Sequence, residues 1–158
     1  MQLVLIGGPP RSATYLHKLL DLCEKRGVRE RVITTGWKPQ AEASEVLASC
    51  DAAIIPLSPQ SGLSAVALPD KAFEYLASGL PVISTRVPDL EEIFSDCMYF
   101  YDTREELTQI LNQLLADPNR KCTPEYQIKK ASKYDWRILS KTYERLIAQL
   151  VEGESGQQ

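Results

Sequence analysis

The stretch PDKAFEYLASGLPVIS at residues 69–84 contains a helix signal followed directly by a strand signal. Pro69 suits the start of a helix, and Gly79 suits the left-handed residue at which a helix ends. The residues between them favour a helix over 70–77. A strand over 81–84 follows, with a proline at its first position, where a strand tolerates one. A helix that leads within a few residues into an apolar strand is typical of α/β proteins.

The same alternation of short apolar runs and helix-favouring segments extends over the whole chain. We expect further strands at residues 3–6, 31–35, 52–55 and 98–101, and helices near residues 16–23, 41–49, 89–94, 103–115 and 135–150. Because the strands are almost continuously apolar, they predict a parallel sheet covered on both faces. The expected fold is a Rossmann-like, doubly wound α/β domain over residues 1–151, with a disordered tail at 152–158.

Composition limits the classes of partner. The 158 residues include 18 Lys and Arg against 21 Asp and Glu, and this net charge of −3 argues against a nucleic-acid partner. No apolar run approaches the roughly 18 residues that span a bilayer. Lys129, Lys130 and Lys133 form either a solvated helix face or a basic face on a membrane surface, so membrane contact is expected to be at most peripheral. The apolar start is too short for a signal peptide, and the four cysteines lack zinc or redox spacing. We therefore expect a cytoplasmic protein with reduced thiols.

Ligands of doubly wound sheets bind at the carboxyl ends of the strands, so the loops at that edge are the candidate sites. The loop Gly7–Ser12 contains Gly8 and leads into a helix, which makes it a weak anion site or a plain turn. It lacks the third glycine of a dinucleotide fingerprint and the Gly-Lys-Ser/Thr of a P-loop. Lys71 and Glu74 are three residues apart on the expected helix. They either form an exposed ion pair or present a cation and a carboxylate to a ligand.

Residues 69–83 resemble the nucleotide-sugar-binding helix of family-4-type glycosyltransferases with the GT-B fold. The pattern of that helix often reads Pro-Asn-Lys-x-x-Glu-Tyr-x-Ala-x-Gly-x-Pro-Val. Segments 3–9, 31–36, 50–56 and 134–136 agree in the same order, so the resemblance extends from Gln2 to about Val151. It implies that the chain is the C-terminal, donor-binding half of a GT-B enzyme and lacks the N-terminal acceptor-binding domain, which would be supplied in cis or in trans.

The resemblance also implies an activity. A sugar would pass from a nucleoside-diphosphate-sugar donor to a hydroxyl acceptor with retained configuration, without a metal ion or other cofactor. Glu74 would bind the ribose hydroxyls, and Lys71 would lie near the diphosphate. Gly36 and Trp37 would wall the nucleobase, although a buried tryptophan is an equal alternative. Backbone groups of Gly62, Leu63 and Ser64 would lie near the transferred sugar or the phosphates. No catalytic residue is identified.

The sequence departs from the family pattern at two places. Val66 stands where many relatives carry a second glutamate aimed at the donor sugar. In the complete fold an earlier strand and helix, carrying an Arg and a Lys that hold the diphosphate, precede the first strand found here. We therefore expect the isolated chain to be inactive. The alternative is a non-catalytic nucleotide-binding or protein-docking module.

Overall fold

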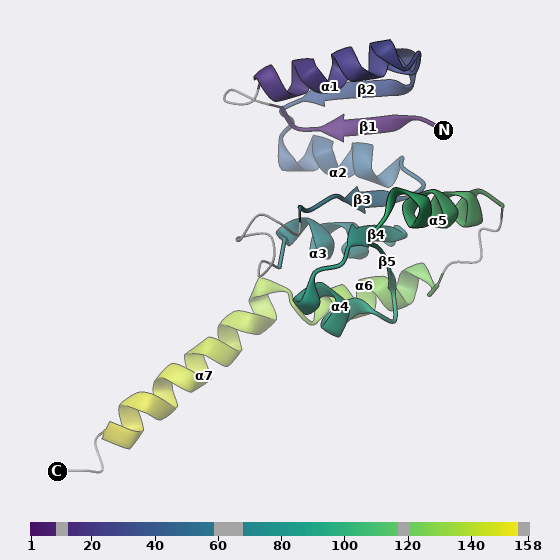
Figure 1. Cartoon of the computed structure of the whole chain (residues 1–158). Coiled ribbons are helices and arrows are strands. Elements are labelled where there is room, and N and C mark those ends of the chain that lie inside the picture. The colour runs from purple at the N-terminus through teal and green to yellow at the C-terminus, as the bar shows by residue number, and fades with distance from the viewer. Residues whose placement is uncertain (9–12, 59–67, 117–120, 155–158) are drawn as a thin grey trace. The chain divides into compact units, whose positions relative to one another are not determined.

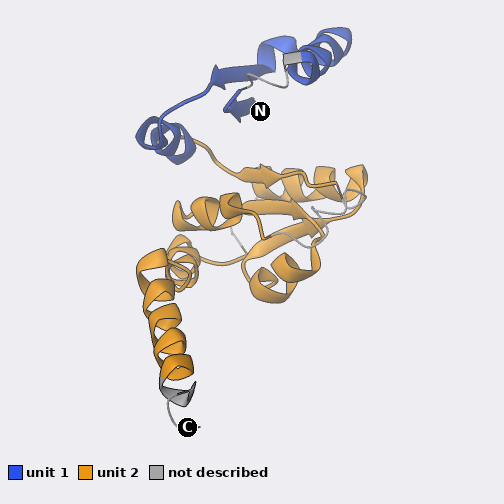
Figure 2. Cartoon of the chain, turned by 90° about the vertical axis from the view of Figure 1, so that its left-hand side faces the viewer, with its two compact units in different colours: residues 1–49 blue, residues 50–158 orange. Residues whose placement is uncertain are grey.

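A computed structural model describes residues 1–8, 13–58, 68–116 and 121–154 of the chain (Figure 1). These residues form two compact units, residues 1–49 and residues 50–158 (Figure 2). Each unit combines parallel strands with helices, which confirms the α/β class and the parallel arrangement of the strands. The strands lie in two sheets, one in each unit.

Unit 1 contains a two-stranded parallel sheet. Its strands are β1 (Leu3–Ile6) and β2 (Val32–Gly36), and its helices are α1 (Ala13–Lys25), the 3-10 helix η1 (Arg29–Arg31) and α2 (Gln40–Ala48). Leu3 is paired with Val32 and Leu5 with Thr34. The partly buried face of α1 is formed by apolar residues at helical spacing, Leu16, Leu19, Leu20 and Cys23.

Unit 2 contains three parallel strands in the order β3-β4-β5. The strands are β3 (Ala53–Ile55), β4 (Val82–Thr85) and β5 (Met98–Tyr101). The helices are α3 (Asp70–Ala77), α4 (Pro88–Phe94), α5 (Arg104–Ala116), α6 (Pro124–Ser132) and α7 (Trp136–Glu154). The core of this unit consists of apolar side chains from β4, α3, α4 and β5, including Leu76, Val82, Ile83, Leu90, Phe94 and Met98, all of them fully buried.

The ends of two helices follow the sequence signals closely. α3 has the predicted bounds, and Gly79 just beyond it has a φ of +68°. At the start of α5 the Glu106 amide donates to Thr103 Oγ1 at 3.2 Å. The Glu106 carboxylate in turn accepts a hydrogen bond from the Asp102 amide at 2.7 Å. Together these bonds form a capping box, with the return bond one residue earlier than usual.

The last helix, α7, extends away from the sheet of its own unit (Figure 1). It reaches Glu154, three residues into the predicted tail, and residues 155–158 lie outside the described residues. Every residue from 141 to 151 is exposed, including Tyr143, Leu146 and Leu150. In the parts of the chain that the structure describes, no helix is long and apolar enough to span a membrane. The single domain expected over residues 1–151 stays a prediction.

Candidate functional site

The helix α3 begins after the loop that follows the carboxyl end of β3, which is the edge of the sheet where ligands of such folds bind. One face of α3 is fixed by packing, because Ala72 and Leu76 have no exposed surface. Phe73 adds an aromatic contact, with its ring centroid 5.5 Å from that of Phe94. Lys71 and Glu74 lie on the exposed part of the helix. The packing therefore holds these two side chains toward solvent in a fixed direction.

Lys71 and Glu74 do not satisfy each other. Within the described residues the two side chains form no ion pair, and neither makes a side-chain hydrogen bond to another described residue. An exposed intrahelical ion pair was one of the two interpretations of their spacing, and this geometry does not support it. A carboxylate and an ammonium that have no partner among the described residues can bind ligand groups of complementary charge.

Gly79 fixes the far end of the same helix. Its φ of +68° lies in the left-handed region, and a Cβ added to it would lie 3.0 Å from Pro124 Cβ. A glycine is therefore needed both for the backbone turn and for the close approach of α6. This contact holds the helix that carries Glu74 against the rest of unit 2.

The carboxyl edge of the sheet in unit 1 brings three of the predicted residues together. The Gly7 amide donates to the Gly36 carbonyl at 3.0 Å. A Cβ added to Gly8 would lie 3.2 Å from Gly36 Cα and 3.7 Å from the Trp37 amide nitrogen. The side chain of Trp37 is 76 % exposed, so the buried alternative is wrong. The two strand ends thus form a tight glycine contact beside an open indole ring.

Some of the predicted residues cannot be placed. Gly62, Leu63 and Ser64 lie outside the described residues, as does Val66, so their expected roles stay predictions. Gly8, Gly36 and Trp37 are grouped within unit 1, and Lys71 and Glu74 within unit 2.

Thr85, the last residue of β4, is not among the candidate site residues predicted from the sequence. Its Oγ1 atom is buried and has no hydrogen-bond partner among the described residues. A buried hydroxyl without a partner costs about 1–3 kcal/mol unless something else satisfies it. Because Thr85 ends the central strand at the ligand edge, a bound molecule is one possible source of that partner. A threonine after an apolar run was the only signal in the sequence.

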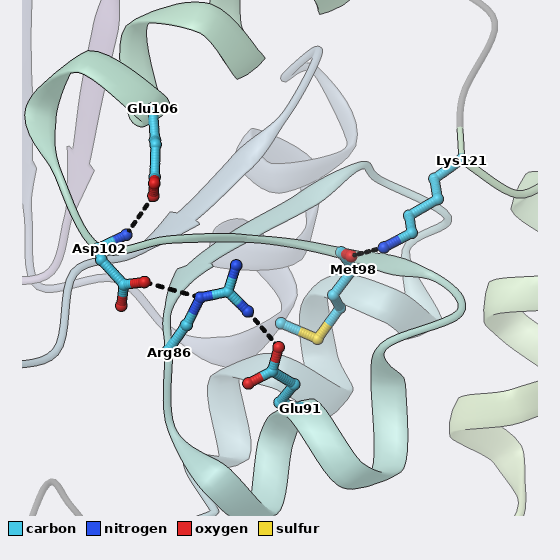
Figure 3. Close-up of polar contacts among 6 residues, drawn as sticks. All are labelled: Arg86, Glu91, Met98, Asp102, Glu106 and Lys121. Carbon is cyan, nitrogen blue, oxygen red and sulfur yellow. Dashed lines mark hydrogen bonds and ion pairs between the residues drawn. The ribbon is translucent and has the colours of Figure 1, made fainter.

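Arg86, the next residue, joins the ends of β4 and β5 (Figure 3). Its Nε donates to the Asp102 carboxylate at 2.8 Å, and its Nη1 forms an ion pair with Glu91 at the start of α4. The hydrogen bond to Asp102 and the charge of Glu91 raise the pKa of the Arg86 guanidinium. Since two carboxylates already contact this cation, it connects the end of β4 to Asp102 and to α4, and it is a poor phosphate ligand.

A second polar cluster connects α6 to the turn before β5. The Asp96 carboxylate accepts a hydrogen bond from Tyr126 Oη at 2.5 Å and forms an ion pair with Lys130. Partial burial opposes ionisation of Asp96, but the bonds from Lys130 and Tyr126 lower the pKa of its carboxyl to about 2. Lys130 is therefore engaged in the fold, whereas Lys129 and Lys133 are exposed.

Comparison with solved structures shows a shared fold. Sucrose-phosphate synthase from Thermosynechococcus elongatus superposes with a TM-score of 0.80 at 17 % identity, over 96 % of this chain and 39 % of its own. HepE from Anabaena, solved in complex with UDP-glucose, gives a TM-score of 0.70 at 16 % identity, over 96 % and 41 % of the two chains. The C-terminal domain of the group 1 family protein LpcC from Francisella tularensis gives 0.63 at 18 % identity, over 85 % and 69 %.

The chain spans about 40 % of the length of the first two of these proteins. No curated protein sequence is significantly similar to the chain. A family model described as "Glycosyl transferases group 1" matches residues 1–117, well over half of the 158 residues. The chain therefore belongs to the group 1 glycosyl transferases.

Proposed function

We propose that the chain is the donor-binding part of a sugar-transferring enzyme and binds a nucleoside-diphosphate sugar. The observation that carries this proposal is the pair Lys71 and Glu74, which is exposed, unpaired within the described residues and held by the buried face of α3. The family match over residues 1–117 supports it. HepE, which shares the fold, was solved with UDP and with UDP-glucose.

Each part of the proposed site has a chemical role. The Glu74 carboxylate accepts hydrogen bonds from the two ribose hydroxyls, and the Lys71 ammonium lies beside the diphosphate. The exposed indole of Trp37 stacks on the nucleobase, next to the glycine contact of Gly8 and Gly36. Backbone groups of Gly62–Ser64 contact the phosphates or the sugar.

In the proposed reaction, the bond between the anomeric carbon of the sugar and the diphosphate oxygen breaks. A bond from that carbon to the acceptor hydroxyl oxygen forms, the acceptor loses its proton, and the nucleoside diphosphate leaves. We propose that the transfer retains the configuration of the sugar and needs no metal ion. An acceptor-binding domain, in cis or in trans, supplies the second wall of the site, because the reacting groups must be held together in one closed cleft.

The first experiment is a titration of the purified chain with UDP and other nucleoside diphosphates, each compared with its 2′-deoxy form. A charge-assisted hydrogen bond contributes about 1.5–3 kcal/mol, so we expect the ribonucleotide to bind at least about 10-fold more tightly. Glu74→Gln removes that preference. Glu105→Gln is the matched control, because Glu105 is an exposed glutamate on α5 of the same unit and undergoes the same charge change.

Four results would contradict the proposal. Equal binding of ribo- and deoxyribonucleotides by the unmodified chain would remove the role of Glu74. An equal effect of Glu105→Gln would show that only net charge matters. The absence of binding at millimolar nucleotide would favour a docking module. Measurable sugar transfer by the 158-residue chain alone would show that it is not a partial enzyme.

A further inference from the structure

Unit 2 brings together two cysteines that are 25 residues apart in the sequence. Cys97 lies in the turn before β5, and Cys122 lies two residues before α6. The Cys122 thiol donates a hydrogen bond to the Cys97 carbonyl at 3.8 Å. Cys97 is completely buried in the core, and the partly buried Cys122 packs against the same core cluster. The spacing of the cysteines does not predict this contact, because it depends on how distant segments pack.

Neighbouring hydrogen bonds hold Cys122 beside the start of β5. The Lys121 amide donates to Tyr99 Oη at 2.7 Å. The side chain of the same residue reaches the strand as well, since Lys121 Nζ donates to the Met98 carbonyl at 2.9 Å (Figure 3). The residue before Cys122 is therefore bonded to both residues that follow Cys97. These bonds keep the two cysteines next to each other in the folded chain.

Oxidation of this pair leaves no buried acceptor without a partner. The Cys97 carbonyl also accepts a hydrogen bond from Gln127 Nε2 at 3.3 Å. The Gln127 side chain is almost completely buried, so this bond belongs to the core and remains when Cys122 loses its S–H proton. Because an unsatisfied buried carbonyl is costly, the bond from Gln127 makes the loss of the thiol donor tolerable.

The protonation of the two thiols decides how they react. Burial, together with the charge of Asp96, raises the pKa of the Cys97 thiol to about 12. Burial also raises the pKa of Cys122, although a side-chain hydrogen bond with Cys97 opposes this rise. Because the thiolate is the attacking form, neither cysteine reacts rapidly at neutral pH. The partly exposed Cys122 is the one that an oxidant in solution reaches first.

We propose that Cys97 and Cys122 form a reversible disulfide when the folded chain meets a small-molecule disulfide such as oxidised glutathione. The Cys122 thiolate attacks one sulfur of that molecule, a mixed disulfide forms, and one small thiolate leaves and takes up a proton. Cys97 then loses its proton, and its sulfur attacks Cys122 Sγ and expels the second small thiolate. Two protein thiols are oxidised, and one small disulfide is reduced to two thiols.

The disulfide would connect the start of α6 covalently to the start of β5. It closes a loop of the unfolded chain and therefore stabilises the folded state. Because α6 approaches α3 closely at Gly79, the bond also restrains the helix that carries Lys71 and Glu74. The proposal concerns contacts within unit 2 and does not depend on nucleotide binding.

The test is incubation of the folded full chain with oxidised glutathione, followed by digestion with trypsin. We expect residues 87–104 to be linked to residues 122–129, which are the peptides that contain Cys97 and Cys122. The link should disappear after reduction with dithiothreitol. In the Cys23→Ser/Cys50→Ser double variant, which retains only the proposed pair, the intact mass should fall by that of two hydrogen atoms. Oxidation should raise the Tm of unit 2 by at least about 5 °C and slow amide exchange in α6 by at least about 10-fold.

Cys122→Ser in the double-variant background is the matched control, because serine is similar in size and keeps a hydrogen-bond donor. It should form no linked peptide and gain no Tm on oxidation. Cys97→Ala changes the other partner, so Cys122 should then stop at the mixed disulfide with glutathione. Three outcomes would overturn the proposal. They are a mixed disulfide on Cys122 that persists although Cys97 is present, linkage to Cys23 or Cys50 in place of the pair, and linkage only after unfolding in urea.

Discussion

Substitution of Gly79 by alanine is the sharpest test of how α3 is held in place. A residue with a Cβ in the left-handed region costs about 1–2 kcal/mol. The new Cβ would also lie 3.0 Å from Pro124 Cβ, whereas carbon atoms pack best at about 3.5–4.0 Å. Overpacking of this kind adds about 1–3 kcal/mol. We therefore expect Gly79→Ala to reduce the free energy of unfolding of unit 2 by about 3 kcal/mol, which lowers its Tm by roughly 15 °C.

Two controls separate the backbone cost from the contact with Pro124. Gly27 has a φ of +66° and nothing within 4 Å of an added Cβ, so Gly27→Ala carries the backbone cost alone. Pro124→Gly removes the atom that the new methyl group would meet. In a double-mutant cycle, Gly79→Ala should therefore cost about 1–3 kcal/mol less in the Pro124→Gly background.

Chemical denaturation followed by circular dichroism gives the free energies, and hydrogen exchange of the β4 amides assigns the transition to unit 2. If the cycle shows no coupling between Gly79 and Pro124, the close approach of α6 does not explain the glycine. If Gly79→Ala is as stable as the unmodified chain, residue 79 does not have the left-handed conformation.

Three further perturbations address the ligand edge and the polar cluster. Asp70→Asn removes an exposed negative charge from the first turn of α3, beside Lys71. We therefore expect calorimetry to show that nucleoside diphosphates bind several-fold more tightly. An unchanged affinity would place the phosphates elsewhere. Thr85→Val replaces a buried hydroxyl that has no partner among the described residues. The free energy of unfolding of the free chain in urea should rise by about 1 kcal/mol, and the nucleotide sugar should bind less tightly. A loss of stability would mean that the hydroxyl already has a partner. The pKa of Asp96 is about 2 in the folded chain and near 4 in the unfolded chain, so its stabilising contribution is complete above pH 4 and is lost as the pH falls through 2. Because the Asp96 side chain is 43 % exposed, we expect a contribution of only about 1 kcal/mol, and Asp96→Asn should flatten this part of the stability curve; an unchanged curve would contradict it.

The sequence predicts features that depend on neighbouring residues. Pro69 and Gly79 bracket α3, so both of its ends are found to the residue. The period of the apolar residues likewise identifies the partly buried face of α1. These signals are local, because capping and helix periodicity involve residues no more than a few positions apart.

Features that depend on distant residues are not predictable in this way. The exposure of Trp37 depends on which side chains pack against it, and the neighbouring residues in the sequence are compatible with a buried or an exposed tryptophan. Arg86 becomes a structural tie only because β5 brings Asp102 beside it, 16 residues along the chain. The separation of the strands into two sheets also reflects pairing between distant segments, about which hydrophobic periodicity carries no information.

The two tryptophans of the chain lie in different units, and both are largely exposed. Trp37 follows β2 in unit 1, and Trp136 begins α7 in unit 2. Their fluorescence is therefore expected to be red-shifted and accessible to a soluble quencher such as acrylamide. Trp136→Phe leaves an emission signal from unit 1 alone, and Trp37→Phe leaves one from unit 2 alone. The chain thus contains two intrinsic optical reporters, so events at the loop after β2 and at the last helix can be followed separately without any attached dye.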